Sequence, residues 1–154
     1  MSLNMLAIAD GLATRYSAAN VTPPPGYTTI RNSTARITNN LGPFPCVEVY
    51  PPGPGESEFV YASGYRTGSH AFTVRFYYGQ SSGDLARDFV GLYAWFGILI
   101  DQLHGATKLG LAPTVTKAFL TDAGIGTHTF AGIEYAVVEL AVEVDTSDVT
   151  PWTP

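Results

Sequence analysis

The sequence predicts an α+β fold, a two-layer sandwich in which an N-terminal helix and one long helix pack on one face of an antiparallel sheet of four or more strands. Two segments carry apolar residues at helical spacing, and other segments carry β-branched and aromatic residues in a period of two. The chain has 154 residues and one cysteine, which is enough for one core without an intrachain disulfide. We assign residues 1–146 to a single α+β domain and residues 147–154 to an extended C-terminal tail.

The composition is unusually poor in charge. Only 14% of the residues are charged, against roughly 25% in typical soluble domains, and the formal net charge is −5. This balance disfavours a protein that binds nucleic acid by neutralising phosphates. No secretory signal is visible and no apolar run reaches the roughly 20 residues that span a bilayer, so we expect a soluble protein made in a cytoplasm. The low charge also predicts that another protein covers part of the surface.

The first predicted element is a helix over residues 3–19. Leu6, Ala9 and Leu12 recur at three-residue spacing and form one side of it. The run Pro23-Pro24-Pro25-Gly26 excludes further helix and begins a polar connection that continues to residue 40.

Strand patterns start after this connection. Residues 46–50 combine β-branched and aromatic side chains between prolines, which predicts a short strand. Residues 59–65 and 71–78 predict an antiparallel hairpin with its turn at residues 66–69, where a glycine occurs. In the second of these strands, Phe72, Val74, Phe76 and Tyr78 share one face.

The last third of the chain predicts a second hairpin. Its strands cover residues 114–121 and 130–145, with the turn region around Gly124 and Gly126. One face of the final strand is more apolar than the other and is expected to meet the helices. It carries Ala136, Val138, Leu140, Val142 and Val144.

The long helix is predicted over residues 84–105, between the two hairpins. Leu85, Phe89, Leu92, Phe96, Leu99 and Leu103 repeat at four and three residues and form its core stripe. Apolar residues also lie away from that stripe, at Val90, Tyr93, Trp95 and Ile98. A helix that is apolar nearly all round is buried on more than one side, and one sheet covers only one of them. We therefore expect its other side to meet another subunit.

The chain contains none of the specific catalytic motifs that we sought. A nucleophile elbow, a phosphate-binding loop and a zincin motif are all missing from the sequence. His70, His104 and His128 fall at a predicted strand start, a helix end and a hairpin tip, so they are not expected to converge on a metal. Cys46 lies among apolar neighbours and is expected to be a buried, inert thiol. We therefore predict no catalytic residue, no metal and no cofactor.

The order of elements resembles that of a known family. The N-terminal helix, the strand Phe44-Pro-Cys-Val-Glu-Val49, the aromatic strand Phe72-Thr-Val-Arg-Phe-Tyr-Tyr78, the long helix from Asp84 and the closing hairpin to Glu143 resemble the tail terminator proteins of long-tailed, siphovirus-like bacteriophages, or a related head–tail joining protein. The resemblance covers residues 1–146 as a layout. It implies a structural virion protein, not an enzyme, whose copies form a ring, typically a homohexamer.

The resemblance also implies what the ring does and where it acts. The ring caps the tail tube, ends its polymerisation and forms part of the head–tail interface, or neck. Its expected partners are identical subunits, the tail-tube protein on one side and a neck or head-completion protein on the other. DNA would pass through the lumen without specific binding, and no membrane is involved. The expected location is the virion, after synthesis in the cytoplasm of the host bacterium.

Two sets of candidate residues follow from the ring hypothesis. Tyr93, Trp95 and Ile98 on the second side of the long helix, with Trp152 in the tail, are candidates for the subunit interface. The loop expected to contact the tube or the neck consists of Pro51, Pro52, Gly53, Pro54, Gly55, Glu56 and Ser57.

Other functions fit parts of the same pattern. A head–tail adaptor or a tail-tube subunit also needs oligomerising α+β subunits. A small ligand-binding module would use Tyr61 and Tyr77 as an aromatic platform for a sugar or another planar ligand. A small hydrolase would use His128 with a nearby acid, although the sequence indicates no nucleophile for it.

Overall fold

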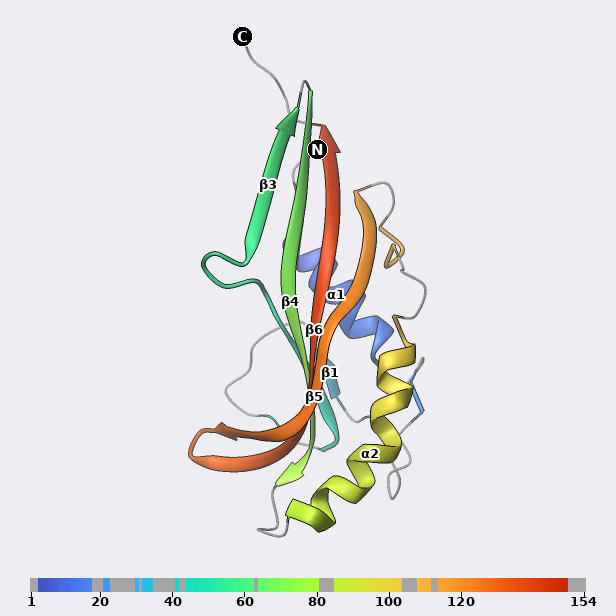
Figure 1. Ribbon diagram of the computed structural model, residues 1–154, viewed down its shortest axis with the longest axis vertical. Helices are drawn as coiled ribbons and strands as arrows, with labels where there is room; N and C mark the ends of the chain where they lie inside the picture. The colour runs from blue at the N-terminus through green and yellow to red at the C-terminus, as the bar shows by residue number, and fades with distance from the viewer. Residues whose placement is uncertain are drawn as a thin grey trace.

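The structure, a computed structural model, describes residues 3–17, 21–22, 30, 32–34, 41, 44–62, 64–80, 85–103, 108–111 and 114–149. Within these ranges the chain forms two helices and six strands, which confirms the α+β class and an antiparallel sheet (Figure 1). The elements in chain order are α1 (Met5–Arg15), β1 (Asn32–Thr34), β2 (Cys46–Tyr50), β3 (Ser57–Ala62), β4 (Tyr65–Gln80), α2 (Leu85–Asp101), β5 (Val115–Phe130) and β6 (Ile133–Val149).

The long strands β4 and β6 form the centre of the sheet. The strand order is β1-β2-β4-β6-β5, and β3 pairs with β4 beside this path. The pairs β2–β4, β3–β4, β4–β6 and β5–β6 are antiparallel, whereas the short strand β1 runs parallel to β2. Along one edge of β4, β2 pairs with residues 73–77 and β3 with residues 65–70. The loop between β2 and β3 therefore leaves the sheet where the partner of β4 changes.

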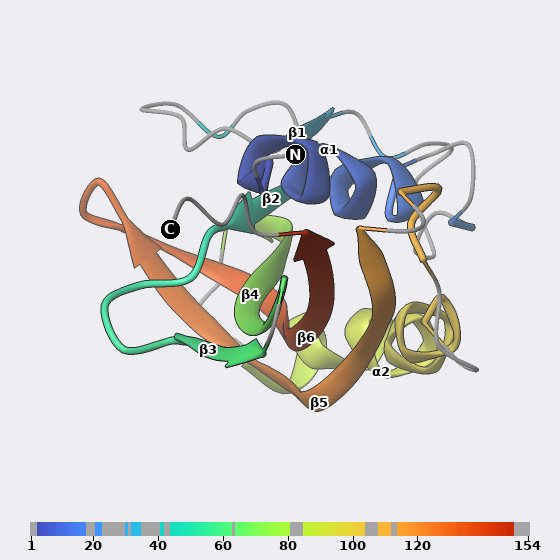
Figure 2. The same cartoon turned by 90° about the horizontal axis from the view of Figure 1, so that it is seen from above.

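One core cluster contains residues of both helices and of the sheet. From β4 it takes Phe72, Val74 and Phe76, which confirms the predicted alternation along this strand. The apolar face predicted for the final strand is also confirmed, because its residues from Ala136 to Val144 at every second position belong to the cluster. Helix α1 contacts β2 and β4, whereas α2 contacts β5 and β6, so the two helices lie over different parts of the sheet (Figure 2).

Helix α1 begins and ends through local contacts. The side chain of Asn4 accepts a hydrogen bond from the Ala7 backbone N–H at 3.0 Å, which satisfies a donor at the helix start. The helix ends at Arg15, earlier than the predicted residue 19, and Tyr16 forms its C-cap. The Tyr16 ring turns into the core and meets Phe76 edge-on, with the ring centroids 5.2 Å apart.

The turn predicted at residues 66–69 is wrong, because these residues belong to β4. Ala62 pairs with Tyr65, so the turn lies between them, and Gly64 adopts a φ of 75° that favours glycine. Gly68 instead serves close packing inside the strand. A Cβ at this position would lie 2.6 Å from Nε2 of His70 and 2.9 Å from Oγ1 of Thr146.

The turn predicted around Gly124 and Gly126 is also wrong. Strand β5 continues through both glycines to Phe130. Phe130 pairs with Ile133, and the two residues between them have positive φ angles of 50° at Ala131 and 80° at Gly132. This is the geometry of a two-residue hairpin turn, so the second hairpin is longer than the sequence predicted.

The sheet also extends past the predicted domain boundary at residue 146. Strand β6 continues through Ser147 to Val149, and Tyr65 of β4 pairs with Val149. Residues 147–149 therefore belong to the sheet and not to a tail. Residues 150–154, with Trp152, lie outside the described residues, as do residue 84 and residues 104–105 of the predicted long helix.

Candidate functional site

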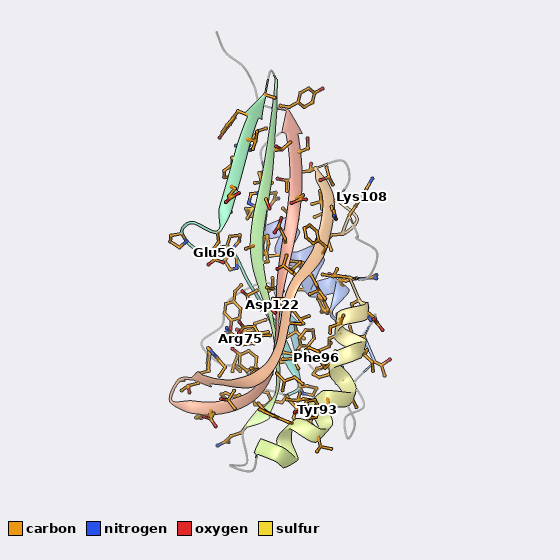
Figure 3. All side chains as sticks on the ribbon, viewed as in Figure 1. Glu56, Arg75, Tyr93, Phe96, Lys108 and Asp122 are labelled. Atoms are coloured by element: carbon orange, nitrogen blue, oxygen red, sulfur yellow. The ribbon has the colours of Figure 1, made fainter. Side chains whose placement is uncertain are left out.

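The outward side of α2 carries an apolar surface. Val90 and Tyr93 are 69% and 66% exposed, and Ala94 and Gly97 are also exposed. Their spacing of three and four residues places them on one side of the helix, which we call the α2 patch (Val90, Tyr93, Ala94 and Gly97). Figure 3 shows Tyr93 on this helix near one end of the molecule. Tyr93, one of the predicted interface residues, is therefore not covered by other parts of the same chain.

Trp95 was also predicted to lie at the subunit interface, and this is wrong. Its side chain is 0% exposed, and its ring meets Phe76 edge-on at a centroid distance of 5.2 Å. Its indole N–H donates a hydrogen bond of 2.9 Å to the carbonyl of Thr22. Leu92, Trp95 and Leu99 form the centre of the buried side of α2. Trp95 is therefore a core residue.

The other two interface candidates have different outcomes. Ile98 is partly buried and packs against the core cluster, so it lies at the margin of the interior. Trp152 lies outside the described residues, and its role as an anchor stays a prediction.

A second exposed apolar surface lies on the β3–β4 hairpin and was missed by the sequence analysis. Phe59, Val60, Tyr61 and Tyr65 are between 42% and 67% exposed, and we call them the hairpin patch. Of the eight large exposed apolar side chains in the described part of the chain, six belong to the hairpin patch or the α2 patch. Phe59 and Tyr61 lie on one face of β3 and Val60 on the other, so the hairpin is apolar on both faces.

The root of this hairpin is fixed by a buried histidine. Nδ1 of His70 lies 2.8 Å from Oγ of Ser57, and its Nε2 lies 3.1 Å from Oγ1 of Thr146. The Phe59 ring meets the imidazole edge-on at 5.3 Å. His70 therefore connects β3, β4 and β6 inside the fold. Its complete burial and these contacts indicate a structural role.

Gly68→Ala is expected to destabilise the fold by about 1–3 kcal/mol, because the added methyl group overpacks the His70 site. Both ring nitrogens of the imidazole are in hydrogen bonds, so moving the ring away from a new methyl group would break them. Thermal unfolding of the variant checks this. Gly124→Ala is the matched control, since a Cβ there meets open space, and equal melting temperatures for the two variants would contradict the prediction.

The predicted contact loop lies at the edge of the sheet; residues 51–56 connect β2 to β3, whereas Ser57 is the first residue of β3. Pro51, Pro54, Gly55 and Glu56 are exposed, and Pro52, Gly53 and Ser57 are partly buried. Backbone hydrogen bonds hold its end: Glu56 N donates to Gly53 O at 3.0 Å, and Ala71 N donates to Glu56 O at 2.9 Å. Figure 1 shows the loop projecting beside the base of β3. The loop is accessible, and its axial contact stays a prediction.

The face of the sheet away from the helices holds a polar network around Arg75. Nε and Nη2 of Arg75 donate to one carboxylate oxygen of Glu139 at 2.9 and 2.8 Å, and the guanidinium lies over the Tyr50 ring. The Tyr50 hydroxyl donates to buried Glu48 at 2.5 Å and lies 2.9 Å from the Tyr77 hydroxyl. Figure 3 shows Arg75 on the side of the sheet away from α2.

His128 lies near the end of β5, opposite Tyr135 and close to the hairpin turn at Ala131 and Gly132, and it belongs to the same network. Its Nε2 lies 3.3 Å from Nη1 of Arg75. Because the guanidinium only donates, this nitrogen accepts and the imidazole is neutral. Burial, and then the Arg75 charge, lower the pKa of His128. The contact joins the end of the β5–β6 hairpin to β4. Because Nε2 of His128 accepts from the Arg75 cation, it is not placed to take a proton from a nucleophile.

His128 gives a testable dependence of stability on pH. Its pKa is lowered in the folded state, so the unfolded chain takes up the proton more readily as the pH falls through about 6.5. The free energy of unfolding is expected to fall below that pH. His128→Gln keeps an acceptor for Arg75 without a titrating group, and urea unfolding at pH 7.5 and 5 is expected to show a smaller loss than in the wild type. An equal loss in both proteins would contradict the assignment.

An aromatic binding platform made of Tyr61 and Tyr77 is not present. Tyr77 is fully buried, whereas Tyr61 is exposed near the far end of β4, opposite Arg66. On the face of the sheet away from the helices, the described residues line a hollow of about 490 Å³ over the hairpin root, between Val60 and Ser147, and another of about 250 Å³ over Gly124 and Gly126.

The described ranges contain no cluster of three or more His, Cys, Asp or Glu side chains that could hold a metal ion. Burial, and then the charge of Glu48, raise the pKa of Cys46 to about 12, so this buried thiol stays protonated at neutral pH. Within the same ranges, neither helix has the length and apolar character needed to cross a bilayer.

No protein-family model matches this chain, and no curated protein matches its sequence.

Proposed function

We propose that this chain is a structural virion protein of a long-tailed bacteriophage, a tail terminator whose copies form a ring on the tail tube. The ring ends tube polymerisation and forms part of the head–tail interface. As part of this proposal, the fold is a two-layer sandwich in which α1 and α2 cover one face of the sheet. The other face and the outward side of α2 remain available to partners.

The α2 patch is the observation that carries the proposal. A surface helix of an isolated soluble domain normally presents charged or polar side chains to water. Between Phe89 and Ile100 the helix has no charged residue, and its exposed side there carries Val90, Tyr93, Ala94 and Gly97. Tyrosine is enriched at the centre of protein interfaces, where charged residues are depleted. This favours self-assembly through α2.

The open face of the sheet supports the second part of the proposal, passage of DNA without binding. Strand register places Glu139, Glu143 and Asp145 of β6 on this face. Glu58 of β3 and Asp122 of β5 lie on the same face, where Arg75 and Lys117 are the opposing charges. A surface with this acidic balance repels phosphate. It is therefore suited to a lumen through which DNA passes.

Negative-stain microscopy of the purified protein, with light scattering for its mass, tests the proposal. We expect closed rings of one size. When these rings are added to tail-tube subunits that are polymerising, we expect elongation of the tube to stop. Long filaments of this protein alone would contradict a terminator and indicate a tube subunit. Rings that bind the head connector without stopping elongation would indicate an adaptor. A protein that stays monomeric at every concentration, with or without tube subunits, would contradict assembly altogether.

A further inference from the structure

We propose that the hairpin patch of one copy packs on the α2 patch of the next copy, so that these two surfaces form the repeating contact of the assembly. The inference rests on the proposed function and names the two surfaces that meet. It commits to a second copy of this chain as the occupant of each patch.

The placement of the two patches favours a contact between copies. A ring of identical subunits uses a heterologous contact, in which two different surfaces of each copy meet. The β3–β4 hairpin lies at one end of the long axis of the molecule, and α2 lies at the other end (Figure 1). The patches therefore cannot cover each other within one chain, but they can do so between neighbours.

The shapes of the two patches are also compatible. Phe59 and Tyr61 project from the same face of β3, and Arg66 lies over the Phe59 ring with its guanidinium carbon 5.4 Å from the centroid. On α2, a Cβ at Gly97 would meet no atom within 4 Å, so the helix surface is low beside the Tyr93 side chain. A low helical surface next to an aromatic ring accommodates the aromatic side chains of a thin hairpin.

The exposed area and the charges of the two patches also favour their contact. With about 150–250 Å² for a whole aromatic side chain, the exposed parts of the six large residues in the two patches present about 600 Å². That is about half of the roughly 1,200 Å² buried in a small standard interface, before any rim residue is added. Arg66 on the hairpin and exposed Asp101 at the end of α2 supply opposite charges for that rim.

Cysteine cross-linking tests which surfaces meet. Val60→Cys and Ala94→Cys place one thiol in each patch and keep every aromatic side chain, whereas the native Cys46 is 1% exposed and does not react. With a short bis-maleimide, the double variant is expected to give a ladder of covalent dimers, trimers and larger products. A mixture of the two single variants is expected to give one dimer band, and each single variant alone none.

Each other outcome overturns the inference. Dimers from Val60→Cys alone would show hairpin meeting hairpin, and dimers from Ala94→Cys alone would show helix meeting helix. If light scattering finds an oligomer but no 60–94 product forms, the assembly uses other surfaces and the proposed ring survives. If the protein is monomeric under all conditions, the proposed function fails together with the inference.

A charge substitution gives an independent readout. Tyr61→Glu is expected to weaken self-association by about 30-fold or more, the usual effect of losing a central aromatic residue at an interface. Ile133→Glu is the matched control, because Ile133 is an exposed apolar residue at the tip of the other hairpin, outside both patches. Equal association constants for the two variants would overturn the role of the hairpin.

Discussion

Replacing Trp95 with alanine is expected to lower the free energy of unfolding by about 3–5 kcal/mol, the usual cost of removing a buried tryptophan side chain. The indole is fully buried, meets Phe76 edge-on and donates to the Thr22 carbonyl. Its loss leaves a cavity between α2 and β4 and removes the donor for that carbonyl. Urea unfolding followed by circular dichroism measures the change.

Tyr93→Ala is the control for this measurement, since it lies on the same helix but on the exposed side. Within a single chain its effect on unfolding is expected to stay within about 0.5 kcal/mol, as for most surface substitutions. The comparison is made at a protein concentration low enough to keep both variants monomeric. If the two variants lose similar stability, the assignment of Trp95 to the core and Tyr93 to the surface is wrong.

Tyr93→Glu is expected to prevent assembly while leaving the fold intact. The tyrosine is 66% exposed in one chain, so a carboxylate there stays solvated in the monomer. In the assembly the same carboxylate would be buried against apolar side chains of the neighbour. Loss of a central aromatic residue costs about 2–4 kcal/mol per contact, which is roughly 30- to 1,000-fold in the association constant. Size-exclusion chromatography over a concentration series measures the loss.

Leu6→Glu is the control for the surface charge. Leu6 is an exposed apolar residue on α1, outside both patches, and its substitution is expected to leave the elution profile unchanged. Circular dichroism spectra of both variants should match the wild type. A wild-type oligomer formed by Tyr93→Glu would contradict the role of the α2 patch.

Local sequence signals were sufficient for the strands that the core uses most. Prolines on both sides set the limits of β2, which the structure gives as Cys46–Tyr50. Alternation was clear in β4 and β6 because one face of each strand packs against the helices. A pattern of this kind depends only on neighbours in sequence, so it can be recognised without the fold.

Turns could not be placed correctly from glycines alone. Gly64 and Gly132 occupy turns with positive φ, but Gly68, Gly124 and Gly126 lie inside strands. Gly68 is small because His70 and Thr146, the latter from the other end of the chain, occupy the adjacent space. A close contact between distant residues leaves no local signal.

The same dependence on distant contacts explains why Trp95 was wrongly predicted to lie at the subunit interface. Trp95 and Tyr93 are both large aromatic residues away from the predicted stripe, and the sequence does not tell which of them turns inward. Contacts with Phe76 and Thr22 decide it, and both residues are far away in the chain. The hairpin patch did carry a signal that was overlooked. Phe59, Val60 and Tyr61 are three consecutive apolar residues, which a strand with one solvated face does not need.

Sedimentation velocity of the wild type and Tyr93→Glu, side by side over a range of concentrations, tests most directly whether the exposed side of α2 assembles the protein. We expect one sharp boundary for the wild type, at the mass of a closed oligomer, and a monomer boundary for the variant. A wild-type monomer at all concentrations, or the same oligomer for both proteins, would contradict assembly through this side of α2.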